Sequence, residues 1–209
     1  MNRWHLFHEI GHAIIGLIFE GYLIKIEKII LNKDDISKLN LNVSDLAYTH
    51  QKFVPVEQKI IDENEQLFAM INGLNLLAGI AGATYLCPIE KPKAKIVSSS
   101  NFNRILKTEG ASGDFEFIND KKMIYSWYLF VKNQLDEYSA YEYHAFLMNI
   151  LQITFLDDRI RVTSQKIYDL ILENPNSNIE HDQLLKLFPI ELQSEFRNNI
   201  IEKLKEMSE

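Results

Sequence analysis

The chain has 209 residues, of which 46% are hydrophobic and 24% are charged, a balance typical of a soluble globular protein. Its formal net charge of -7 argues against nucleic acid as a partner, because phosphate binding needs Lys and Arg clustered on one face. The single cysteine, Cys87, excludes an internal disulfide and a thiolate metal site. We therefore expect a cytoplasmic protein in which Cys87 is a buried structural thiol.

The N-terminal third predicts a helix followed by two strands. Apolar residues recur at helical spacing over residues 3–20, and Gly21 supplies a stop. Residues 22–31 alternate before a β-branched run, which predicts a strand with one buried face, and residues 46–54 predict a second short strand. The polar stretch between the two strands is expected to be a loop.

A second helical region begins at Pro55 and continues towards Tyr85. No charged side chain lies between Glu65 and Glu90, so this stretch is long enough to cross a bilayer. Asn and Gln side chains interrupt it, however, and its three glycines lower its hydrophobicity. We interpret it as a central buried helix whose glycines allow close packing against a neighbour, and we expect no membrane association.

The rest of the chain is expected to be helical. Residues 88–107 have the composition of a linker or insertion, and residues 108–114 form a turn. Helical spacing then covers five stretches, with a break at 174–177 after the third. They are 115–135, 138–155, 162–173 and the two amphipathic stretches 180–187 and 191–207. The predicted fold is mainly α (α+β), a single domain over 1–209 made of parts 1–87, 88–107 and 108–209, with a C-terminal helical bundle.

The string His8-Glu9-Ile10-Gly11-His12 lies inside the first predicted helix. Residues four apart share a helical face, so His8 and His12 can present imidazole nitrogens to one zinc ion. Glu9 points beside the ion, where it can take a proton from a zinc-bound water and deliver it to a leaving amine. The motif predicts a Zn²⁺-dependent hydrolase with Glu9 as the catalytic base.

The residues after the motif exclude one family of zinc peptidases and offer several candidates for the third metal ligand. The long metzincin pattern requires Gly and His where this chain has Ile15 and Ile18, which excludes that family. Two neutral histidines leave the charge of the ion uncompensated, so a carboxylate ligand is expected. The carboxylates available are Glu57, Glu63, Glu65 and Asp114. Asp114 stands at the first turn of a predicted helix, beside the capping residue Ser112, although an acid there also simply favours the helix dipole.

Together these strings resemble the peptidase domain of the FtsH family of membrane-anchored, ATP-dependent zinc proteases. That family has a HEAGHA-type helix followed by a strand, similar to residues 8–13 and 24–31 here. It also has a small-residue helix end, similar to residues 78–84, and a GAS-x-D string, similar to residues 110–114. The resemblance covers nearly the whole chain, and it implies that Asp114 is the third metal ligand.

The resemblance implies peptide-bond hydrolysis without an unfolding motor. The paired glutamates at the family's helix end are replaced by Ala83 and Thr84, and the chain has no P-loop, no ATPase domain and no evident membrane anchor. We therefore expect peptides or unfolded proteins as substrates, with a homo-oligomer and a separate ATPase as compatible partners. By the same analogy, the strand near residues 46–49 is placed to pair with an extended substrate.

Two other hypotheses explain the same motif. A binding or regulatory protein that keeps the peptidase fold would account for Ala83 and Thr84, whereas retention of Glu9 favours an enzyme. A regulatory metallopeptidase that cleaves a transcriptional repressor would use a helical glutamate as third ligand, which makes Glu65 the competitor of Asp114. Three further histidines, His50, His144 and His181, each lack a second ligand at the spacing of a metal site. We expect them to be surface or core residues.

Overall fold

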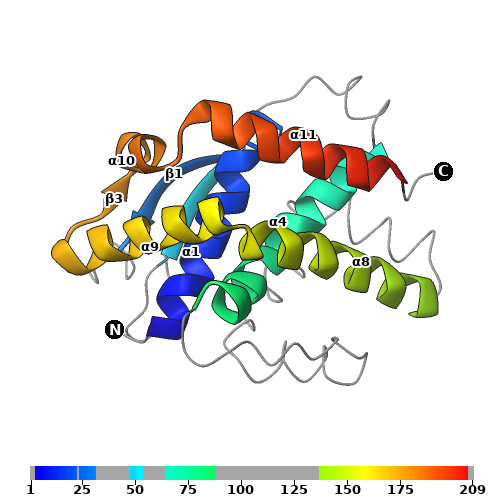
Figure 1. Cartoon of the computed structure of the whole chain (residues 1–209), viewed down its shortest axis with the longest axis horizontal. Coiled ribbons are helices and arrows are strands. Elements are labelled where there is room, and N and C mark those ends of the chain that lie inside the picture. Colours follow the sequence, from blue (N-terminus) through cyan, green and yellow to red (C-terminus); the bar gives the residue numbers. More distant parts are fainter. Residues whose placement is uncertain (1–2, 23, 32–47, 54–64, 88–136, 207–209) are drawn as a thin grey trace.

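A computed structural model describes residues 3–22, 24–31, 48–53, 65–87 and 137–206 (Figure 1). These residues are mainly helical with a small antiparallel sheet, as the sequence predicts. In chain order the elements are α1 (Arg3–Ile18), β1 (Ile24–Ile30), β2 (Tyr48–Phe53), α4 (Glu65–Tyr85), α8 (Glu137–Leu156), α9 (Asp158–Glu173), β3 (Ile179–Glu180), α10 (His181–Leu187) and α11 (Ile190–Glu206).

The predicted elements that fall on described residues are confirmed, with small shifts of their ends. Helix α9 begins at Asp158, four residues before the predicted start at 162, because Asp157 caps its N-terminus. Strand β3 was not predicted, because two residues carry no periodic signal. The predicted start of the second helical region at Pro55, the linker over 88–107, the turn with Asp114 and the helix over 115–135 lie outside the described residues.

Helix α1 ends in a tight turn that sends the chain back along the helix as β1. Gly21 adopts φ 88°, a left-handed conformation in which a side chain is strained, so the predicted stop is confirmed. The side chain of Ile26 in β1 packs so closely on Gly16 of α1 that a Cβ at residue 16 would overlap it. This contact places the sheet directly against the helix that carries the HEIGH motif.

The sheet has the order β2-β1-β3 and is antiparallel throughout. Strand β2 pairs with β1 from Ile24 opposite Phe53 to Ile30 opposite Tyr48, with one register shift between Ile26 and Lys28. Among the described strands, β2 therefore occupies one edge, and its other side is turned away from β1.

Helices α1 and α4 cross at glycine-to-glycine contact. A Cβ on Gly82 of α4 would lie 2.5 Å from the backbone oxygen of Phe7 and 2.7 Å from the Cα of Gly11. A Cβ on Gly11 of α1 would likewise overlap the backbone oxygen of Ala78 in α4. Small residues on both helices thus bring the two backbones together, the role predicted for the α4 glycines.

Helix α4 lies in the core, as predicted. Its stretch Leu67–Tyr85 is long and apolar enough to cross a bilayer, with a mean hydropathy of 1.5, and 83% of that apolar window is buried inside the protein. Cys87, just beyond the helix, is also buried. Core helices of globular proteins share this length and composition, so the helix alone gives only weak evidence for a membrane span.

The C-terminal helices cover the α1–α4 pair. In Figure 1, α9 passes beside α1, while α11 runs along the top of the view and α8 along its lower right. The ring of Tyr168 in α9 stacks on Phe7 of α1 at a centroid distance of 5.0 Å. Fully buried aromatic side chains, among them Phe19, Phe155 and Phe188, join these elements into one hydrophobic core.

Candidate metal centre

His8 and His12 occupy the face of α1 that is buried against α4. Their exposed fractions are only 6% and 7%, so both imidazoles are inside the protein. Two buried polar rings require partners, because an unsatisfied ring nitrogen in an apolar setting is unfavourable. The partners of these rings define the geometry of the site.

The ring nitrogens of the two histidines face each other. The Nε2 atoms of His8 and His12 are 3.3 Å apart, and the rings are nearly perpendicular, at 76°. Two nitrogen ligands bound at about 2.0–2.1 Å to a tetrahedral ion are separated by about 3.3–3.4 Å. The spacing predicted from helical periodicity therefore becomes, in the folded protein, the spacing that a shared zinc ion requires.

A backbone carbonyl of α4 fixes the tautomer of His12. Its Nδ1 lies 2.8 Å from the carbonyl oxygen of Asn75. A carbonyl oxygen only accepts hydrogen bonds, so Nδ1 carries the proton and the Nε2 of a neutral His12 presents a lone pair towards His8. Zinc-bound histidines typically make this kind of second hydrogen bond.

Gly79 of α4 packs directly against the two rings. A Cβ at this position would lie 2.5 Å from both Nε2 and Cε1 of His8, and it would also overlap Nε2 of His12. Any residue other than glycine would therefore displace the imidazoles. The two facing imidazole nitrogens form a donor pair that fits a divalent ion, and the close packing on Gly79 holds both rings in place.

Glu9 is held by strand β2. Its Oε2 accepts a hydrogen bond of 2.6 Å from the backbone N–H of Thr49, and the hydroxyl of Thr49 donates to the backbone oxygen of Glu9 at 2.8 Å. The carboxylate is only partly buried, in contrast to its neighbours His8 and His12. The carboxylate of the proposed base therefore lies against strand β2.

The first turn of α1 brings two more rings near the site. The Trp4 ring is tilted at 33° over His8, with a centroid distance of 6.1 Å. Burial lowers the pKa of His5, the positive form of His8 lowers it further, and the carboxylate of Glu9 acts in the opposite direction. At neutral pH this part of the helix therefore favours a neutral His5.

The four candidate carboxylates for the third ligand have side chains outside the described residues. Within them, no three side chains of the His, Cys, Asp or Glu type converge on one point. Asp114, Glu57 and Glu63 lie outside these residues, and Glu65 begins α4 with its side chain outside them. His50 and His144 fall on β2 and α8, again with undescribed side chains, whereas the Nε2 of His181 lies 3.3 Å from Glu20 Oε1.

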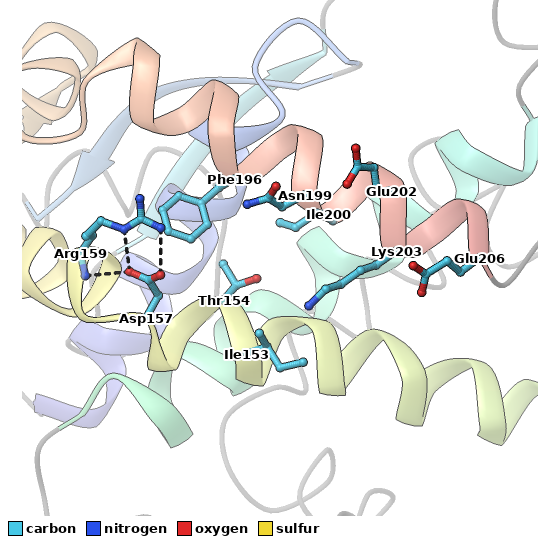
Figure 2. A pocket seen from close by; sticks show the side chains of 10 residues that line it. All are labelled: Ile153, Thr154, Asp157, Arg159, Phe196, Asn199, Ile200, Glu202, Lys203 and Glu206. Atoms are coloured by element: carbon cyan, nitrogen blue, oxygen red, sulfur yellow. Dashed lines mark hydrogen bonds and ion pairs between the residues drawn. The ribbon is translucent and has the colours of Figure 1, made fainter.

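A separate hollow of about 280 Å³ lies between α8 and α11 (Figure 2). Its lining combines apolar side chains with the charged residues Asp157, Arg159, Glu202, Lys203 and Glu206. No residue of the HEIGH motif contributes to it. The hollow is therefore distinct from the candidate metal centre.

Three residues of the site escaped the reasoning from sequence. Asn75 contacts His12 through its backbone oxygen, which every residue type has, so the sequence gives no sign of this contact. The contact of Thr49 with Glu9 can be recognised only when the position of β2 against α1 is known. Gly79 carried a usable signal, because glycines spaced along α4 indicate close packing against another helix. Comparisons with protein families, curated proteins and solved structures found no match to this chain.

Proposed function

We propose that the chain is a zinc-dependent metallopeptidase in which His8, His12 and Asp114 hold the ion and Glu9 is the general base. The observation that carries the proposal is the pair of Nε2 atoms at 3.3 Å, one of them on an imidazole oriented by the Asn75 carbonyl. Asp114 enters through the resemblance to the FtsH peptidase domain. A relationship of this chain to that family is likewise part of what we propose.

Each residue of the proposed site has a separate role in peptide hydrolysis. When bound, zinc would lower the pKa of a coordinated water and polarise the scissile carbonyl. Glu9 takes the proton from the attacking water and then gives it to the leaving amine. His12, fixed by Asn75, and His8 hold their lone pairs in the required directions, while the crossing with α4 keeps solvent away from both rings.

The proposed substrates are peptides, flexible segments or proteins already unfolded by a partner. Strand β2 bonds to Glu9 and lies at an edge of the described sheet, where an extended chain can pair with it. A cytoplasmic location, a homo-oligomer and a separate ATPase partner belong to the same proposal, with neither nucleic acid nor membrane as a partner.

The direct test combines zinc titration with digestion of unfolded casein. The zinc-loaded wild type should cleave casein, and Glu9→Gln should bind zinc equally well but cleave about 10²- to 10⁴-fold more slowly. Glu173→Gln, at an exposed position on the end of α9, is the matched control and should retain full activity. Equal cleavage by wild type and Glu9→Gln would reject the assignment of the base.

A bare hydrogen bond between the imidazoles is the alternative explanation of the 3.3 Å distance, with Nε2–H of His8 donating to His12. In that case His8→Ala and His12→Ala would change stability but not zinc content. A zinc site predicts instead that each substitution removes a stoichiometric ion. Zinc bound with no cleavage by any form would favour the non-catalytic binding protein.

The third ligand is tested by comparing two substitutions. Asp114→Ala should remove or greatly weaken zinc binding, whereas Glu65→Ala should leave it unchanged. Zinc affinity measured by competition with a chromophoric chelator distinguishes them. Loss of zinc only in Glu65→Ala would overturn Asp114 and favour the repressor-cleaving type of metallopeptidase.

A further inference from the structure

The contact between Glu9 and Thr49 is a two-point attachment of the proposed base to the sheet. One bond joins the carboxylate to the Thr49 backbone N–H at 2.6 Å, and the other joins the Thr49 hydroxyl to the Glu9 backbone oxygen at 2.8 Å. Thr49 itself is only 3% exposed. The hydroxyl bond fixes α1 against β2, and the N–H bond holds the reactive group.

The N–H that holds Glu9 belongs to the side of β2 that is turned away from β1. Thr49 lies opposite Ile29 in the antiparallel register. In such a ladder, alternate residues direct their backbone groups to the neighbouring strand and the others direct them outward. Among the described strands β2 is at the edge of the sheet, so an outward N–H is the donor that an added strand would use.

The carboxylate and an added strand therefore compete for one donor. A short hydrogen bond between a backbone N–H and a carboxylate is stronger than one between neutral groups, so it holds Glu9 in a defined place. An extended peptide that pairs with β2 must offer its own carbonyl oxygen to Thr49 in place of Glu9. The displaced carboxylate is then available to a water at the neighbouring imidazoles.

We propose that Thr49 is a positioning residue that keeps Glu9 on strand β2 until an extended peptide takes over the Thr49 N–H. The inference rests on the proposed function and deepens it, because it makes the substrate release the base. It selects peptides long enough to pair with β2 over dipeptides. It also explains why Glu9 is tied to the sheet although its neighbours on α1 face α4.

The first experiment measures binding without cleavage. The ligand is the shortest casein peptide that the zinc-loaded wild type cleaves, labelled with fluorescein, and the proteins are zinc-loaded Glu9→Gln and Glu9→Ala. Both lack the carboxylate and its charge, but Gln keeps an oxygen that can accept from Thr49 whereas Ala does not. Glu9→Ala should bind the peptide about 2- to 10-fold more tightly.

Acetohydroxamate is the control ligand, because it reaches the metal without pairing with a strand. It should bind both variants equally. Equal peptide affinities, or tighter binding by Glu9→Gln, would overturn the inference while the zinc and hydroxamate results still uphold the metal site. If no casein peptide is cleaved by the wild type, the proposed function fails and this inference fails with it.

The second experiment tests the hydroxyl attachment in the active enzyme. Thr49→Val keeps the N–H and the β-branched shape but loses the bond to the Glu9 backbone, whereas Thr49→Ser keeps that bond. Valine should lower kcat about 3- to 10-fold with KM little changed, and serine should restore it. Equal kcat values for the two variants, both with full zinc content, would reject the positioning role.

Discussion

The α1–α4 crossing and the hollow between α8 and α11 place polar groups in opposite ways. At the crossing, two imidazoles are almost fully buried and glycines bring the helix backbones into contact. In the hollow, Arg159 is 47% exposed and bonds to Asp157 (Figure 2). It also bonds to Glu195 on the surface. The structure of the crossing is therefore expected to be sensitive to the addition of a single side-chain atom. The hollow is expected to tolerate substitution of its exposed charged residues.

This difference has a physical origin. A buried polar ring is stabilised only by the partners the fold provides, so small displacements are costly. An exposed ion pair exchanges its partners with water and is screened by salt, so it adds little to stability. A site with chemistry is expected in the first kind of environment, and the HEIGH motif lies there.

The largest predicted effect follows substitution of Gly79 by Ala. The new Cβ would overlap the Nε2 atoms of both histidines, so we expect zinc affinity to fall at least about 100-fold. A chelator competition titration measures this loss. The control is Thr84→Ala, an exposed position on the same helix, which should bind zinc like the wild type. Unchanged affinity in Gly79→Ala would show that the ion does not lie between these rings.

Gly82→Ala should break the crossing itself. Its Cβ would lie 2.5 Å from the Phe7 backbone oxygen, and backbone atoms cannot move aside by changing a rotamer. Overpacking of this kind costs about 1–3 kcal/mol, although alanine recovers up to about 1 kcal/mol of helix propensity. Urea unfolding measures the net loss. A variant as stable as the wild type would mean that the helices are further apart than described.

The sequence predicts the helices well because their burial pattern repeats every turn. It also predicts that His8 and His12 share a face, since helical spacing alone determines this. It cannot predict that Thr49 holds Glu9, because that contact joins residues 40 positions apart and depends on how β2 lies against α1. Strand β3, with two residues, is formed by pairing with β1 rather than by any local pattern.

At the hollow, loss of the helix cap should lower the stability of the protein more than loss of the ion pair. Asp157 accepts a hydrogen bond from the backbone N–H of Arg159 at 2.8 Å and so caps α9. Asp157→Ala should lower the free energy of unfolding by about 1 kcal/mol. Zinc affinity should not change, because the hollow shares no residue with the motif. A loss of zinc here would show that the two regions are coupled.

The smallest effect is a difference in acid stability between the wild type and Asp157→Asn, which keeps a capping side chain but has no charge. The side-chain bonds from Arg159 lower the pKa of Asp157 below its ordinary value of 3.8, and the backbone N–H groups of α9 act in the same direction. A carboxyl with a lowered pKa in the folded state stabilises the protein above pH 3.8, and this contribution is lost as the pH falls through the folded-state pKa.

The two proteins should therefore differ slightly in stability at pH 6 and converge between about pH 4 and pH 2. Urea unfolding midpoints across this range measure the difference, and added salt should reduce it because the carboxylate is partly exposed to solvent. Curves that remain parallel down to pH 2 would mean that Arg159 contributes nothing through this charge. The only role left for Asp157 would then be its cap, which asparagine supplies equally well.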